Sequence, residues 1–69
     1  MVQYVDVTSS NIQAVGHDGT DLFVKFLNGS EYKYYNVPEN IYNELKDAGS
    51  VGQYLNQNIK GSFGFEKVA

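Results

Sequence analysis

The pair Asn28-Gly29 separates two segments of alternating polarity, and this hairpin restricts the possible folds more than any other feature. A two-residue turn would pair Leu27 with Ser30 and would set the apolar side chains of one strand beside the charged side chains of the other. A three-residue turn, with Gly29 in the left-handed position of a β-bulge, brings both apolar sets to one face. We therefore predict the bulged turn. The apolar face then consists of Leu22, Val24, Phe26, Tyr32 and Tyr34.

The opposite face of this hairpin mixes aromatic, lysine and acidic side chains. Antiparallel sheets commonly pack one face and leave the other in solvent, so this face is a candidate binding surface. Aromatic residues beside lysines can stack on the bases of single-stranded RNA, and aromatic residues can equally close a homodimer or bind a protein partner. Cover by the tail or by the first strand is the alternative. The face consists of Phe23, Lys25, Glu31, Lys33 and Tyr35.

Three further segments have the pattern of strands. Residues 1–7 and 12–17 are rich in β-branched side chains, and a turn cluster at 18–21 leads from the second of them into the hairpin. Residues 62–68 alternate Phe63 and Phe65 with small or charged residues. We expect this tail to dock beside the sheet as an edge strand, because two exposed phenylalanines would be costly.

Two helices are predicted after the hairpin. Pro38 and the apolar spacing that follows it favour a helix over 38–48, capped by Asn36 or Val37 and followed by Gly49 in the left-handed conformation. The second helix begins at Ser50, which has capping-box spacing to Gln53, and ends at Gly61. Its apolar side chains recur every four residues, at Val51, Leu55 and Ile59.

Together these segments predict an α+β fold for a single domain, residues 1–69. An antiparallel sheet of three to five strands would be followed by two short helices packed on one face. A chain of 69 residues without cysteine depends on one small apolar core and has no disulfides or thiolate metal sites. We predict neither a metal nor a cofactor.

Charge and hydropathy set expectations for partners and location. Five lysines and no arginine against eight acidic residues give a formal charge of −3, which disfavours tight binding to nucleic-acid phosphates. No apolar run approaches the roughly 18 residues of a membrane span, and the N-terminus lacks a secretory pattern. We expect a mature, cytoplasmic protein that does not bind membranes.

A second candidate site lies at the start of the second predicted helix. Backbone N–H groups at such a position can hold a phosphate or carboxylate, and small residues leave room for it. Helical spacing would place Asn56 and Lys60 on one face of a shallow polar pocket, with Tyr54 at its edge. The alternative is a capped, tightly packed helix start, and we expect Gly52 to allow a close approach of a neighbouring backbone. The set is Ser50, Gly52, Tyr54, Asn56 and Lys60.

His17 is the only histidine and would be the default general base of an enzyme. A Ser/His/Asp arrangement would need Ser9 or Ser10 to reach it from another part of the sheet. The alternative is an aromatic side chain that packs beside a tyrosine and caps the turn at 18–21. This turn has carboxylates but not the later glutamate of a calcium loop, so we predict an ordinary β-turn and a protein that is not an enzyme.

Several short motifs lie along nearly the whole chain: Ser9-Ser10-Asn11-Ile12, Val15-Gly16-His17-Asp18, Gly29-x-x-Tyr32-x-Tyr34, Val37-Pro38 and Ser50-x-Gly52-x-Tyr54-x-Asn56. In their order and spacing, these motifs resemble the KTSC domain family. This family occurs at the C-terminus of some lysyl-tRNA synthetases and as free-standing proteins of bacteria and phages, and the resemblance implies a small sheet with two helices. His17 stands where the family usually has tyrosine, and Leu55 where phenylalanine is common.

We therefore predict a non-catalytic binding module of KTSC type, a protein-interaction or modulator protein of bacterial or phage origin. The acidic balance favours a protein partner. The alternative is an accessory domain that binds RNA through the aromatic and lysine face, as the family's association with tRNA synthetases implies.

Overall fold

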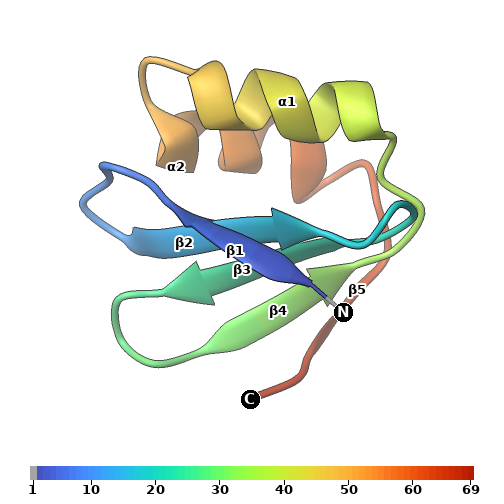
Figure 1. The fold of residues 1–69 in the computed structure, drawn as a ribbon, viewed down its shortest axis with the longest axis horizontal. Coiled ribbons are helices and arrows are strands. Elements are labelled where there is room, and N and C mark those ends of the chain that lie inside the picture. Colours follow the sequence, from blue (N-terminus) through green and yellow to red (C-terminus); the bar gives the residue numbers. More distant parts are fainter. Residues whose placement is uncertain (1) are drawn as a thin grey trace.

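The computed structural model describes residues 2–69 and consists of a five-stranded antiparallel sheet with two helical segments above one face (Figure 1). The strands lie in chain order across the sheet: β1 (Gln3–Asp6), β2 (Ile12–His17), β3 (Leu22–Phe26), β4 (Glu31–Tyr34) and β5 (Phe65–Lys67). The first helical segment is α1 (Glu39–Asp47), and the second consists of α2 (Val51–Tyr54) followed directly by the π-helix η1 (Leu55–Ile59). This is the predicted α+β fold, with Met1 of the first predicted strand outside the described residues.

The β3–β4 hairpin has the predicted bulged turn. Gly29 is left-handed, with φ of 94°, and its N–H donates to the carbonyl of Phe26 at 3.0 Å. The N–H of Phe26 donates in turn to Ser30 at 2.8 Å. Val24 therefore pairs with Tyr32, and the apolar sets of both strands face the helices. The core beneath the helices includes Leu22, Val24, Tyr34, Val37, Tyr42 and Leu45.

An irregularity in β2 was not predicted from the sequence. Ile12 pairs with Phe26 and Ala14 with Lys25, so the register shifts at Gln13. Such a bulge inserts one extra residue and changes the face on which later side chains lie. As a result Ile12 and Val15 are both buried in the core, at 1% and 0% exposure, although they are three residues apart.

The N-cap residue predicted for α1 was wrong. The N-cap is Pro38, whose carbonyl accepts the N–H groups of Ile41 and Tyr42 at 3.0 and 3.2 Å. Neither Asn36 nor Val37 caps the helix, because Asn36 turns the chain two residues earlier. Asn36 is left-handed, with φ of 57°, a conformation that asparagine tolerates better than most residues.

The end of α1 also differs from the prediction. The N–H of Ala48 donates to the carbonyl of Leu45 at 3.3 Å, and Ala48 itself is extended, with φ of −65° and ψ of 143°. The chain leaves the helix in this extended conformation, so Gly49 does not take a left-handed one. Among residues 2–69, the positive-φ glycines are Gly19 and Gly29.

The second predicted helix is divided into α2 and η1. Ser50 is its N-cap, as predicted, and its Oγ accepts the N–H of Gln53 at 3.4 Å. The N–H of Lys60 donates to Leu55, five residues back. An apolar repeat of four residues drifts by about 40° per step on an α-helix, and the wider π-turn corrects this drift. Val51, Leu55 and Ile59 are accordingly all buried.

The tail forms the predicted edge strand. Phe65 of β5 pairs with Tyr34 and Lys67 pairs with Tyr32. Phe63 packs against the core, whereas Phe65 remains 55% exposed. Docking thus covers one of the two phenylalanines.

None of the helices within residues 2–69 has the length and apolar character that crossing a membrane requires.

Gly16 supports a first prediction, because Val2 and the start of the neighbouring strand β1 pack closely against it. A Cβ at this position would lie 2.4 Å from Cγ1 of Val2 and 2.9 Å from the backbone oxygen of Gln3. We expect Gly16→Ala to displace β1 and to lower the free energy of unfolding by about 1–3 kcal/mol in urea denaturation. The control is Gly61→Ala, where a Cβ meets no atom within 4 Å. Equal effects of the two substitutions would contradict this account.

Candidate functional site

The outer face of the sheet, which is the face turned away from the helices, carries the first predicted site. Lys33 lies between two aromatic rings there. Its Nζ is 5.6 Å from the ring centre of Phe23, 5.5 Å from that of Tyr35 and 3.5 Å from the carboxylate of Asp21. The structure thus brings Phe23, Lys33 and Tyr35 together as predicted, and the ammonium group of Lys33 is already engaged within the chain.

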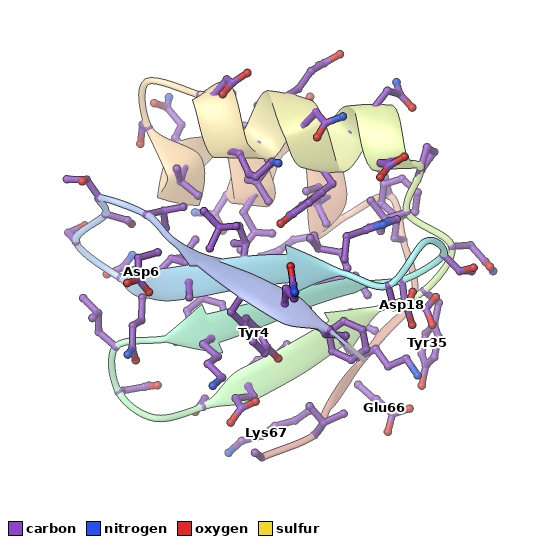
Figure 2. All side chains as sticks on the ribbon, in the orientation of Figure 1. Tyr4, Asp6, Asp18, Tyr35, Glu66 and Lys67 are labelled. Atoms are coloured by element: carbon purple, nitrogen blue, oxygen red, sulfur yellow. The ribbon has the colours of Figure 1, made fainter. Side chains whose placement is uncertain are left out.

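Lys25 is engaged in a similar way by a residue from β1. Its Nζ lies 4.4 Å from the ring centre of Tyr4, which extends from β1 over the neighbouring strands (Figure 2). Burial, and next the nearby carboxylate of Glu31, raise the pKa of Tyr4. The predicted alternative of cover by the first strand is therefore realised over this part of the face.

Carboxylates outnumber lysines on the outer face. Lys33 lies opposite Glu66 of β5, and Lys25 lies opposite Glu31. A surface that binds nucleic-acid phosphates needs an excess of cationic groups. The face and its rim carry Lys25 and Lys33 against Asp6, Asp21, Glu31 and Glu66.

His17 joins the sheet to α1. One ring nitrogen, Nδ1, accepts the N–H of Gly19 at 3.1 Å, so the other, Nε2, carries the proton and donates to the carbonyl of Val37 at 2.6 Å. The ring also stacks on Tyr42, with centres 5.2 Å apart. This is the predicted turn-capping aromatic. Ser9 lies before the opposite end of β2 and accepts backbone N–H groups there, so the structure does not assemble the Ser/His/Asp arrangement.

The second predicted site is only partly assembled. Ser50, Gly52 and Asn56 line a polar cavity of about 450 Å³ that is closed on its other side by residues 8–11. Tyr54 instead donates its hydroxyl to Glu44 at 2.8 Å, a contact that raises the pKa of Tyr54.

Lys60 does not share this polar cavity with Asn56. The α-helical spacing from which the shared face was predicted does not apply, because the backbone between the two residues forms the π-turn. Gly52 also differs from the prediction. A Cβ there would meet the Oγ of Ser9 at 3.5 Å, which is an ordinary side-chain contact and not a close approach of backbone.

An aromatic groove that was not predicted lies on the helix side of the sheet. It has a volume of about 390 Å³. The ring of Tyr32 is 5.5 Å from that of Phe26 and 6.0 Å from that of Phe65. The Nζ of Lys60 stands 5.8 Å from the ring centre of Phe26. The lining consists of Phe26, Asn28, Ser30, Tyr32, Tyr34, Lys60 and Phe65.

The sequence contained one signal for this groove. Alternation in the tail placed Phe63, Phe65 and Lys67 on one face, but the register between the tail and β4 was not available from the sequence. Tyr32 and Tyr34 were assigned to the core. Tyr34 is indeed 2% exposed, and its burial raises its pKa, whereas Tyr32 is only partly buried and forms the floor of the groove.

The turn at 18–21 is the predicted β-turn and supports a second prediction. The Oδ1 of Asp18 accepts the N–H groups of Asp21 at 2.7 Å and Thr20 at 2.9 Å, and these contacts lower the pKa of the carboxyl. The folded state therefore favours the carboxylate. This contribution to stability is complete above the unfolded pKa of about 3.9 and is lost as the pH falls through the lower folded value.

We expect Asp18→Asn to be less stable than the parent near pH 7 and the difference to shrink between about pH 4 and pH 2. Urea denaturation at a series of pH values measures it. A difference that stays constant over this range would show that the charge of Asp18 does not stabilise the turn.

Gly52 gives a third prediction. Since the structure leaves room for a Cβ, Gly52→Ala should raise the free energy of unfolding by up to about 1 kcal/mol through helix propensity. Thermal and urea denaturation would both detect the change. A clear loss of stability would instead support the close backbone approach that the sequence suggested.

Comparisons with known proteins agree with this fold. The model of the KTSC domain matches residues 8–63. A KTSC domain protein from Yersinia pestis has a crystal structure that aligns over the whole of both chains, with a TM-score of 0.91 and 32% identity.

Sequence relatives fall into two groups. A lysine–tRNA ligase of Nostoc punctiforme is 42% identical over 48 residues, which are 70% of this chain but 9% of the ligase. A small protein of Tsukamurella paurometabola is 37% identical over 59 residues, 83% of this chain and 88% of that relative. The family match covers most of the chain and the structural match all of it, so this chain belongs to the KTSC domain family.

Proposed function

We propose that this chain is a non-catalytic binding module that takes a segment of a protein partner into the aromatic groove. The observation that carries this proposal is the exposure of Phe65, which is 55% accessible at the edge of the groove. Aromatic side chains that remain exposed beside a concave surface are typical anchors of protein interfaces.

The relatives support a modular role. Similar sequence occurs within lysine–tRNA ligases of much greater length and also makes up most of a small bacterial protein. A domain with this distribution suits a recognition module that serves different partners. We extend the proposal to a bacterial or phage accessory protein that acts in the cytoplasm, where tRNA ligases work.

RNA binding through the outer face is the less favoured function. Lys33 is held by Asp21 and Lys25 lies over Tyr4, so both lysines would have to leave contacts within the chain to bind phosphate. The carboxylates of this face would repel the nucleic-acid backbone. The groove, in contrast, has lysine as the one charged residue type among its lining residues.

A displayed library of random peptides tests the proposal. We expect selected peptides to shift the amide resonances of groove residues, and Phe65→Ala to weaken their binding about tenfold or more. The matched control is Val5→Ala, because Val5 is 45% exposed on β1, the other edge strand. Binding that does not depend on Phe65, or a library that yields no binder, would contradict the proposal.

A parallel titration with tRNA and single-stranded RNA at about 150 mM salt should show no binding above background. RNA-dependent shifts at Phe23 and Lys25 would favour the alternative function.

Sedimentation tests whether the chain forms a homodimer. A dimer that dissociates in Phe65→Ala would mean that a second copy of the chain occupies the groove. This result would overturn the proposal of a different protein partner.

A further inference from the structure

The outer edge of β5 is open for pairing. β5 is the last strand of the sheet, and within residues 2–69 no further strand lies beyond it. The carbonyl of Gly64 accepts from Tyr35, and the N–H of Val68 donates to Glu31, both on the β4 side. Because backbone groups alternate in direction along a strand, those of Phe65 and Lys67 point away from β4. They are free to bind an added strand.

Phe65 lines the aromatic groove, and Lys67 lies on the same face of the sheet two residues further along β5. Phe65 lies opposite Tyr34, and Lys67 lies opposite Tyr32, whose ring forms part of the groove. A strand paired with β5 would therefore continue the floor of the groove. Its alternate side chains would lie beside Phe65 and Lys67.

The one charged residue among those that line the groove is Lys60. A second lysine, Lys67, lies in β5 opposite Tyr32 and so shares the groove's face of the sheet. The nearest acidic residue in β5 is Glu66, which points to the outer face opposite Lys33 (Figure 2). In a chain of net charge −3, this local pair of lysines complements an acidic segment and disfavours a basic one.

We propose that the partner segment binds as an added strand on β5, with an apolar side chain beside Phe65 and a carboxylate beside Lys67. This inference rests on the proposed function and specifies its partner as an acidic, extended peptide. Because side chains of one face recur every second residue, the recognised pattern is an apolar residue and an acidic residue separated by one position.

A charge exchange tests the partner chemistry. The probes are two capped synthetic peptides of eight residues, each with one phenylalanine in a serine and threonine background. One peptide has glutamate both two positions before and two positions after the phenylalanine, and the other has lysine at both positions, so that either strand direction places one of these residues beside Lys67. We expect the glutamate peptide to bind about fivefold more tightly or better, and Lys67→Glu to reverse this preference.

The matched control is Lys46→Glu, which makes the same change of charge on α1, where the lysine lies over Tyr42. It should leave the preference for the glutamate peptide unchanged. If library peptides require Phe65 but neither they nor the synthetic pair prefer an acidic residue, the proposed function stands and this inference is overturned. If no peptide binds through Phe65, both fail.

Backbone pairing has its own measurement. On binding of the glutamate peptide, amide hydrogen exchange at Phe65 and Lys67 should slow, while exchange at Glu66 should change little. N-methylation of the peptide amides that face β5 should abolish binding, and N-methylation of the alternate amides should not. Equal effects of the two methylated peptides would exclude strand addition.

Discussion

The register of the β3–β4 hairpin is the constraint on which the rest of this structure depends. Gly29 in the left-handed conformation adds one residue to the turn, and this residue decides which side chains meet. A shift by one position would set the apolar side chains of one strand on the face of the charged side chains of the other, so that either Val24 or Tyr34 would face solvent. The core, the acidic outer face and the aromatic floor of the groove all follow from this single turn.

Much of the fold could be predicted because its signals are local. The turn at Asn28-Gly29, the helix start at Ser50 and the alternation of the strands each depend on neighbouring residues. The bulge at Gln13 and the π-turn of η1 could not be predicted in this way. Both are adjustments that bring apolar side chains to a shared core when their spacing does not match a regular strand or helix. The need for them arises only when the sheet and helices pack.

The candidate site was less predictable than the fold, because it depends on contacts between segments that are distant in the sequence. The residues of the outer face were identified correctly from the sequence. The contacts that engage its two lysines, however, come from Tyr4 and Asp21, which lie in other parts of the chain. The groove combines the turn, β3, β4, β5 and Lys60. Its existence depends on the register of β5 against β4, over a separation in sequence of some thirty residues, and on a helix segment that is not α-helical. Neither property leaves a periodic pattern in the sequence.

The order of the strands also bears on how the molecule folds. β1 to β4 form a continuous meander in which each strand can pair as soon as its predecessor is present. β5 is separated from β4 in the sequence by both helical segments, so closing its connection costs more chain entropy than closing any of the hairpins between β1 and β4. Its three residues are all exposed. Because β5 is also the shortest strand of the sheet, fraying of the native sheet should begin at this edge and leave the meander intact.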